Sequence, residues 1–321
     1  MAARIVFMGT PEFAVPSLNA LAESDYEIVG VFTQPDRPAG RGHKLAACPV
    51  KQRALELGLP VFQFERIRKP EGIAQLRELA PDVMVTAAFG QILTQELLDI
   101  PKKGTVNVHA SLLPEYRGSA PINWCILNGE TEAGVTTMLT DAGIDTGDML
   151  LSRSTPIGEL ETAGELTGRL AKIGAELLIE TLTGYLDGSI QPVPQDHARA
   201  SYQPMLDKSL GEIDWTKTAQ VIARQIRGLN PWPGAYTDMP EGRLKLYLAR
   251  PVESDVHALP GAVIASSPKD GLVVRCGEDA VEILELQAPG GKRMTAKAYL
   301  MGKKIEMGVR LGAAPGKDCK A

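Results

Sequence analysis

The chain has 321 residues, of which 44% are hydrophobic and 23% charged, and its formal net charge is −5. This length allows one to three domains, with two the most natural, and a large core without covalent staples. The composition is ordinary for a soluble globular enzyme. It excludes a membrane span, because no apolar run reaches the roughly 18 residues that a bilayer requires.

The cysteines and the first residues indicate a cellular compartment. Cys48, Cys125, Cys276 and Cys319 are far apart and form no C-x-x-C pair. This spacing argues against a disulfide framework or a zinc site, so we expect no metal and a reducing cytoplasm. A strand is predicted to begin almost at once, and we therefore expect no signal peptide or transit segment.

Charge is distributed unevenly along the chain. Residues 208–321 carry 17 basic and 13 acidic side chains, a net of +4, whereas residues 1–207 carry 17 basic and 26 acidic ones, a net of −9. An acidic body with a mildly basic C-terminal part is the asymmetry expected if only that part binds a polyanion.

The first part of the chain alternates predicted strands and helices. Thr10 and Pro11 are predicted to cap and open the first helix. The alternation predicts a doubly wound, Rossmann-like α/β domain with a mostly parallel sheet. The dinucleotide fingerprint G-x-G-x-x-G is missing, which argues against a dehydrogenase. We predict strands over 4–9, 27–32, 60–64, 82–89 and 104–110, and further helices over 49–58 and 70–80.

A long segment over 33–45 follows the second strand. It contains several glycines and prolines and has no apolar periodicity, so we predict a loop without regular structure. Arg37, Arg41 and Lys44 make it basic inside an acidic domain. It is either a solvated surface loop or a nucleic-acid contact that orders on binding.

The strand over 104–110 carries the first candidate catalytic residues. Asn107 and His109 are two residues apart and share one face of a strand, while Val106 and Val108 point to the other face. Asn107 could instead satisfy backbone groups at a strand end, and His109 could be a core histidine. A carboxylate from the glycine-rich turn over 141–148 favours the catalytic reading. Spacing alone does not choose among Asp141, Asp145 and Asp148.

An asparagine, a histidine and an aspartate at strand ends can catalyse acyl transfer without an enzyme nucleophile. The amide and the imidazolium would donate to an oxyanion, and the carboxylate would orient the imidazole. A water held by the carboxylate could relay the proton that leaves the attacking amine.

Further elements lead out of the first domain. We predict a helix over 120–127 with Trp124 in the core, a strand over 148–153, and a capping box at Thr162–Glu165 that opens a long helix ending at Gly184 or Gly188. Prolines mark a linker over 190–207 between domains over 1–189 and 208–321.

The C-terminal part begins with a helix that Thr216 is predicted to cap and that ends at Gly228. Trp232, between two prolines, is either a packing wedge or part of a groove wall. Short strands over 244–249, 262–265, 272–276 and 281–286 predict a small OB-like β-barrel. Lysines and arginines gather near its end at Lys292, Arg293, Lys297, Lys303 and Lys304; the alternative is a solvated charged face.

Several of these motifs resemble those of the 10-formyltetrahydrofolate-dependent formyltransferases. They are Asn107-Val-His109, the run Ser111–Gly118, Asp145-Thr-Gly147 and the run Arg227–Ala235. The resemblance covers nearly the whole chain and is closest to the members that formylate methionyl-tRNA. It implies transfer of the formyl group of 10-formyltetrahydrofolate to the amine of methionine on initiator tRNA. It also implies that Asn107, His109 and Asp145 are catalytic.

The resemblance also implies two binding surfaces. Folate would be bound by Phe89, Gly90, Gln91, Ile92, Leu93, Ser111, Leu112, Leu113, Pro114 and Asp141, and tRNA by Arg37, Arg41, Lys44, Lys208, Arg293, Lys297, Lys303 and Lys304. Alternatives are an amino-sugar nucleotide or a glycinamide amine as acceptor, hydrolysis of the formyl-folate, or a binding module without activity. The chain has no heptads, and we expect a monomer.

Overall fold

The computed structural model describes residues 2–39 and 44–312, which form two compact units. Unit 1 consists of Met1–Pro121, Ala133–Thr155 and Thr167–Gln203, and unit 2 of Ile122–Glu132, Pro156–Leu166 and Pro204–Ala321. Residues 190–203, predicted as linker, thus pack with unit 1. The domain limits 1–189 and 208–321 themselves stay a prediction.

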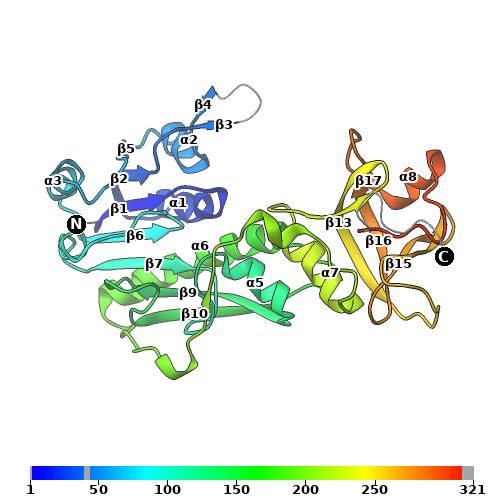
Figure 1. The fold of residues 1–321 in the computed structure, drawn as a ribbon. Coiled ribbons are helices and arrows are strands. Elements are labelled where there is room, and N and C mark those ends of the chain that lie inside the picture. Colours follow the sequence, from blue (N-terminus) through cyan, green and yellow to red (C-terminus); the bar gives the residue numbers. More distant parts are fainter. Residues whose placement is uncertain (1, 40–43, 313–321) are drawn as a thin grey trace. The chain divides into compact units, whose positions relative to one another are not determined.

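Unit 1 is built on a seven-stranded sheet with the order β10-β9-β7-β6-β1-β2-β5 (Figure 1). The five strands from β7 to β5 are parallel, and β9 runs antiparallel to β7. The strands are β1 (Arg4–Gly9), β2 (Glu27–Thr33), β5 (Val61–Gln63), β6 (Val83–Ala87), β7 (Thr105–His109), β9 (Glu132–Leu139) and β10 (Met149–Pro156). This order confirms the doubly wound, mostly parallel sheet.

Both faces of this sheet are covered. On one face, Met8 and Met84 share a core with Leu76 and Leu97 of α3 and α4. On the other face, Val108 of β7 contacts the backbone of α6 at Gly174. The apolar strand residues are fully buried because parallel strands are enclosed on both sides. The helices are η1 (Glu12–Ala14), α1 (Val15–Ala22), α2 (Pro49–Glu56), α3 (Pro70–Leu79), α4 (Gln95–Leu98), α6 (Ala163–Asp187) and η2 (His197–Arg199).

The predicted start of the first helix is wrong. Pro11 is the N-cap of a 3-10 turn, and no side chain caps it. The Thr10 hydroxyl instead donates to the carbonyl of Phe89, at 2.9 Å. Thr10 therefore joins the ends of β1 and β6, a tertiary contact that local capping rules do not foresee.

The segment over 33–45, predicted as a loop, contains two short strands. β3 (Arg37–Ala39) pairs antiparallel with β4 (Lys44–Ala46). Strands of three residues have too few positions for a hydrophobic alternation, which is why the pattern missed them. Residues 40–43, including Arg41, lie outside the described residues.

Both ends predicted for the long helix α6 are confirmed. Glu165 Oε2 accepts from the backbone N–H of Thr162 at 2.9 Å, and the N–H of Glu165 donates to Thr162 Oγ1 at 3.3 Å. This reciprocal pair is a capping box. Gly188, which follows the last helical residue, has a positive φ of 83° and ends the helix.

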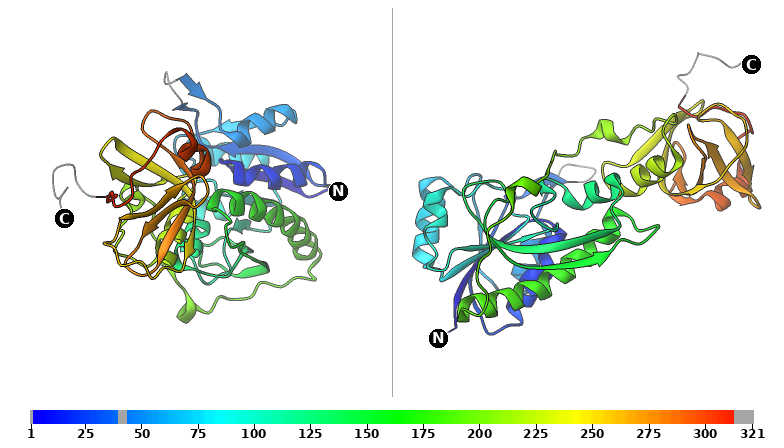
Figure 2. Two further views of the ribbon diagram at one scale, coloured as in Figure 1. Left: turned by 90° about the vertical axis from the view of Figure 1, so that its right-hand side faces the viewer. Right: turned by 90° about the horizontal axis from the view of Figure 1, so that it is seen from below.

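Unit 2 holds an antiparallel sheet with the order β12-β13-β16-β15-β14, to which β17 adds by pairing with β16. The sheet is strongly twisted (Figure 2). The four strands predicted there are confirmed. The elements are α5 (Pro121–Asn128), η3 (Lys208–Gly211), α7 (Ala219–Gly228), β12 (Ala235–Met239), β13 (Gly242–Val252), β14 (Val263–Ser267), β15 (Gly271–Arg275), β16 (Ala280–Gln287), β17 (Met294–Thr295) and α8 (Ala296–Gly302).

Three predictions for unit 2 need correction. Thr218, not Thr216, caps α7, because the Thr216 hydroxyl donates to Asp214. Trp124 is half-buried instead of a core residue, and its Nε1 donates to the carbonyl of Pro204. Trp232 is 52% exposed and is therefore not a packing wedge. No helix in the described part of the chain has the length and apolarity needed to cross a bilayer.

Candidate active site

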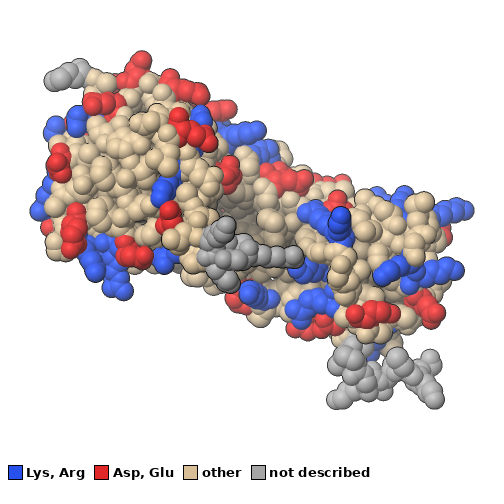
Figure 3. Space-filling view, turned by 90° about the horizontal axis from the view of Figure 1, so that it is seen from above, with Lys and Arg blue, Asp and Glu red and all other residues tan. Residues whose placement is uncertain are grey.

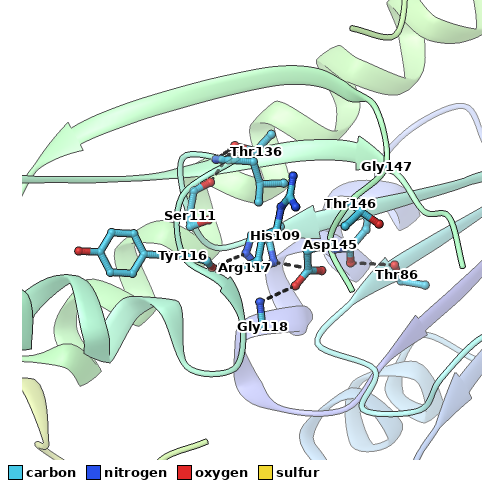
Figure 4. A network of polar contacts seen from close by, with 12 residues as sticks. Thr86, His109, Ser111, Tyr116, Arg117, Gly118, Thr136, Asp145, Thr146 and Gly147 are labelled. Carbon is cyan, nitrogen blue, oxygen red and sulfur yellow. Dashed lines mark hydrogen bonds and ion pairs between the residues drawn. The ribbon is translucent and has the colours of Figure 1, made fainter. Parts of the chain in front are cut away.

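The end of β7 places His109 in a nearly closed environment. His109 is 7% exposed, and its Nε2 is 3.1 Å from the carbonyl oxygen of Tyr116. A carbonyl only accepts, so Nε2 carries a proton and donates. The other ring nitrogen, Nδ1, faces Asp145 (Figure 4). The polar partners on both sides favour a site over a core histidine.

Asp145 is held in place from two directions. Its Oδ2 accepts from the backbone N–H of Gly118 at 2.8 Å, and its Oδ1 is 3.6 Å from His109 Nδ1. That separation is too long for a direct hydrogen bond but within the range of an ion pair, which forms when the imidazole is protonated. The side chain is 19% exposed, so water screens this interaction only partly.

The two competing carboxylates lie elsewhere. Asp141 Oδ1 accepts from the N–H of Gly143 at 3.0 Å and from Thr146 Oγ1 at 2.7 Å, so its side chain closes its own turn. Within the described part of the chain the side chain of Asp148 makes no hydrogen bond or ion pair with His109, and its backbone carbonyl accepts from the N–H of Leu139. Of the three acids that the spacing left open, Asp145 is the one that faces the imidazole.

Asn107 lies on the same face of β7 as His109. Its Oδ1 accepts from the hydroxyl of Thr86 on the neighbouring strand, at 2.8 Å. The amide is therefore oriented, and its Nδ2 has no hydrogen-bond partner among residues 2–39 and 44–312. An oriented N–H donor without a partner suits a ligand oxygen.

The loop after β7 is fixed by its own hydrogen bonds. Thr136 Oγ1 donates to the carbonyl of Ser111 at 2.7 Å and accepts from the N–H of Leu113 at 3.1 Å. The Ser111 hydroxyl donates to the carbonyl of Glu115. Of the predicted folate-binding residues here, Ser111, Leu113 and Pro114 are buried, while Leu112 is half-buried.

The turn after β6 contains the other predicted folate-binding residues. Phe89 and Leu93 are buried, and both amide atoms of Gln91 bond to the backbone of Phe64 and Ile67. Gly90 is exposed with a φ of 80°, and Ile92 is 74% exposed. This turn lies at the carboxyl ends of parallel strands near the point where strand order reverses, where α/β folds bind ligands.

Sequence reasoning missed Thr86, Gly118 and Gln195 as parts of the site. Thr86 is a polar residue within the otherwise apolar run of β6, and this signal could have identified it. Gly118 acts through its backbone. Gln195 donates to the carbonyls of Asp145 and Gly147 at 2.9 and 2.7 Å, although it lies about fifty residues away in the predicted linker.

The residues predicted to contact tRNA differ in their surroundings: some form ion pairs, and others are exposed without a carboxylate partner in the described ranges. Arg37 forms an ion pair with Glu65, and Arg293 with Glu285. The backbone of Lys44, in β4, pairs with that of Ala39 in β3, and Arg41 lies outside the described residues. Lys208, Lys297, Lys303 and Lys304 are exposed and have no carboxylate partner in the described ranges.

Lys208 lines a depression of about 240 Å³ on unit 2. Its walls include an arginine over a tyrosine: the Arg243 guanidinium lies 3.7 Å from the ring centre of Tyr236. On the face that Figure 3 shows, Lys and Arg side chains form small groups separated by Asp and Glu and not one continuous basic field. No group of three or more potential metal ligands occurs within the described residues.

Two family models match this chain. Residues 3–182 match the family model described as formyl transferase, and residues 205–304 match the model of the formyl transferase C-terminal domain. The chain belongs to the formyl transferase family and is a formyl-transferring enzyme.

Within this family its relatives include proteins named methionyl-tRNA formyltransferase. That of Trichlorobacter lovleyi is 53% identical over 96% of both chains. That of Acetivibrio thermocellus is 50% identical over 96% of this chain and 99% of the relative. A solved structure of WlaRD, a sugar 3N-formyl transferase, has a TM-score of 0.64 at 20% identity and covers 88% of this chain and 98% of its own, which shows a shared fold.

Proposed function

We propose that this enzyme transfers the formyl group of 10-formyltetrahydrofolate to the α-amino group of methionyl initiator tRNA. The observation that carries the proposal is the convergence of Asn107, His109 and Asp145 at the end of β7. The relatives named methionyl-tRNA formyltransferase, about half identical over nearly the full length, support the acceptor.

The reaction forms a bond between the acceptor nitrogen and the formyl carbon, and breaks the bond from that carbon to folate nitrogen. The amine loses a proton, and the folate nitrogen gains one. An aminoacyl amine is largely neutral near pH 8, because α-amines titrate at about 7.7–8.0. The main task of the site is therefore to stabilise negative charge on the formyl oxygen.

Asn107 and His109 are placed for this task. The Thr86 hydroxyl fixes Asn107 so that its Nδ2 can donate. Because Nε2 of His109 donates to Tyr116, Nδ1 is the nitrogen that remains to donate to the substrate, and it lies opposite the Asp145 carboxylate. Two preorganised donors then meet the developing charge. Asp145 also has exposure enough to hold a water that accepts the amine proton.

The folate would lie against the turn over 89–93 and the loop over 111–114, with Asp141 at their edge. The partly exposed residues there, Gly90, Ile92 and Leu112, can contact a ligand directly. The buried ones, Phe89, Leu93, Ser111, Leu113 and Pro114, would shape the surface from behind. Gln91 fixes the turn through its two backbone contacts.

We further propose that the sheet of unit 2 closes into an OB-like barrel that contacts tRNA. OB folds commonly bind nucleic acids with basic and aromatic side chains. Lys208, Arg293, Lys297, Lys303 and Lys304 would supply phosphate contacts, together with Arg37, Arg41 and Lys44 of unit 1. Residues 308–312 bond to both edge strands, since the N–H of Gly308 donates to the carbonyl of Val263 in β14 at 2.8 Å and the N–H of Gly312 to that of Asp238 in β12 at 2.7 Å. Rapid exchange of these two amide protons with solvent would contradict the barrel.

The proposed setting is the cytoplasm, and the proposed state a monomer. The dispersed cysteines support the cytoplasm, and the absence of heptads in the sequence supports a monomer. Sedimentation at micromolar concentration should give the mass of one chain.

A transfer assay with labelled formyl-folate tests the function. Charged initiator tRNA, charged elongator tRNA, an amino-sugar nucleotide and a glycinamide amine are offered side by side. We expect formylation of the initiator tRNA above all others. Preferential formylation of the sugar nucleotide would show that it is the acceptor. Release of free formate would show that water is the acceptor.

The same assay tests the residues. His109→Ala and Asp145→Ala should each lower turnover about a hundredfold or more while leaving the fold intact. Asp148→Asn provides the comparison, since Asp148 does not face the imidazole. Near-normal turnover of Asp145→Ala, with a large loss in Asp148→Asn, would reverse the assignment.

A further inference from the structure

Gln195 is a buried glutamine that uses every hydrogen-bonding position of its side chain. It is 5% exposed. Its Oε1 accepts from Nε and Nη2 of Arg117, at 3.1 and 2.6 Å. Its Nε2 donates to the carbonyls of Asp145 and Gly147, at 2.9 and 2.7 Å. The side chain of Gln195 therefore links the buried Arg117 guanidinium to two backbone carbonyls of the turn that carries Asp145.

Arg117 sets the orientation of this amide. A guanidinium only donates, so the oxygen of Gln195 must face it and the nitrogen must face the two carbonyls. Arg117 is 1% exposed, and its other contacts are the hydroxyl of Tyr202 at 3.0 Å and Nδ1 of His197 at 3.1 Å. No carboxylate in the described part of the chain accepts from it. A buried charge surrounded by neutral acceptors is costly, which fits a role other than stability alone.

The turn that Gln195 holds has an unfavourable backbone. Asp145 has a φ of 53°, in the left-handed region that residues other than glycine seldom adopt. Such a conformation persists only where its surroundings enforce it. Gln195 binds the carbonyl of Asp145 itself, and Gly118 binds its carboxylate. Together they fix both the backbone and the side chain of the aspartate.

The segment that carries Gln195 is attached on both sides. Val193 and Met149 exchange two backbone hydrogen bonds of 2.9 Å, and β11 (Tyr202–Gln203) pairs in parallel with β8 (Arg117–Gly118). Gly118, which donates to the Asp145 carboxylate, thus belongs to the same small sheet. Residues 193–203 therefore form a brace for the active site.

We propose that Gln195, oriented by Arg117, is a positioning residue that sets the Asp145 carboxylate opposite His109. This inference rests on the proposed function, because it takes Asp145 to be catalytic. Losing the two donors of Gln195 frees the turn, and a displacement of about 1 Å in such a group can cost a hundredfold in rate.

Two substitutions separate positioning from folding. Gln195→Ala removes all four hydrogen bonds, whereas Gln195→Glu keeps the acceptors for Arg117 and removes the donors to the carbonyls. Both should lower kcat tenfold to a hundredfold, with KM for formyl-folate and for tRNA changed less than about threefold. Gln191→Ala, at an exposed glutamine that precedes this brace, should keep wild-type kcat.

If Gln195→Ala does not fold, Gln195→Glu decides alone, since its carboxylate still pairs with Arg117. A folded Gln195→Glu variant with wild-type kcat would overturn the proposal. A variant with lowered melting temperature but normal kcat per folded molecule would do the same, because it would show a structural role only.

A double-mutant cycle shows whether Gln195 acts through Asp145. In the Asp145→Asn background, Gln195→Glu should lower kcat by less than about threefold further, because coupled residues are not additive. Full additivity would overturn the inference while leaving the proposed function intact. If instead Asp145→Asn alone keeps wild-type kcat, the catalytic assignment has failed, and the inference fails with it.

Discussion

At the residue scale, the candidate site depends on how firmly each polar side chain is oriented. Asn107 is oriented by one hydroxyl, that of Thr86. His109 is oriented by the carbonyl of Tyr116, and Asp145 by the N–H of Gly118. Each candidate catalytic group thus has one hydrogen-bond partner that orients its side chain, and Asp145 and His109 also face each other. Such preorganisation is what makes donors effective in catalysis.

Thr86→Val tests the orientation of Asn107. Valine has the shape of threonine without the hydroxyl, so Asn107 loses its partner and its amide can rotate. Turnover should fall about threefold to tenfold, because one hydrogen bond contributes about 1 kcal/mol. Steady-state kinetics measures the change.

A matched control lies on the adjacent strand. The buried Thr105 hydroxyl has no hydrogen-bond partner in the described part of the chain. Thr105→Val should keep turnover and raise the free energy of unfolding by about 1 kcal/mol, because it removes an unpaired polar group. Equal loss of turnover in both variants would show that Thr86 acts only through packing.

The cysteines make a second residue-scale prediction. Burial raises the pKa of the Cys125 thiol to about 12 and that of Cys276 to about 12. Both thiols therefore stay protonated near pH 8 and below, and the thiolate is the reactive form. Alkylation of the folded protein, in a Cys319→Ser background, should modify the half-buried Cys48 and spare the other two. Mass spectrometry of the native and the unfolded protein measures the alkylation of each cysteine. Modification of Cys125 or Cys276 in the native protein would contradict the prediction.

At the element scale, glycines decide whether the turn between β9 and β10 can form. A Cβ at Gly147 would lie 1.8 Å from the carbonyl oxygen of Leu139, so any side chain must displace the turn. The same turn carries Asp145. Its geometry is set by backbone contacts, which is why three acids in one short stretch could not be told apart by spacing.

Gly147→Ala should therefore lower turnover about a hundredfold through displacement of Asp145. Gly168→Ala is the control: a Cβ there meets nothing within 4 Å, and Gly168 lies inside α6 without a positive φ. It should keep full turnover and stabilise the protein by about 0.4–1 kcal/mol. Thermal unfolding and kinetics of the two variants check both statements, and an active Gly147→Ala would contradict the first.

Elements also differed in how well their pattern predicted them. The long helix α6 was predicted with its capping box and its final glycine, because many periodic positions agree with both ends. The hairpin of β3 and β4 was missed, because each strand has three residues, too few to show an alternation of apolar and polar residues. The N-cap of α7 was assigned two residues early, because Thr216 and Thr218 fit the rule equally well.

At the scale of the whole molecule, charge separates the acidic first part of the sequence from the mildly basic last part. The net of +4 over residues 208–321 is small. Basic side chains there are interspersed with acidic ones (Figure 3). Local groups of lysines, more than a general field, must then account for any contact with phosphates.

Replacing Lys297, Lys303 and Lys304 by alanine should weaken tRNA binding and reduce its salt dependence. Each lost phosphate contact should lower the slope of log K against log salt by about 0.7–0.9. Lys269→Ala, an exposed lysine in the β14–β15 turn, should leave the slope unchanged. Binding measured over a salt series would contradict the assignment if the triple variant kept the wild-type slope.

The sequence by itself determined the alternation of strands and helices, the doubly wound sheet and the pairing of Asn107 with His109 on one face. These follow from local chemistry, since side chains two apart on a strand share a face and apolar runs mark buried strands. The motif over 107–118 indicated the family for the same reason: all its members lie on one strand and its loop.

Only the tertiary structure decided which carboxylate meets the imidazole and what holds it there. Asp145 reaches His109 because a strained turn is held by Gln195, fifty residues later, and by the backbone of Gly118. Such contacts join residues distant in sequence through backbone atoms that every residue has. A single sequence therefore carries no local signal for them, and the segment that provides the brace was predicted as a linker.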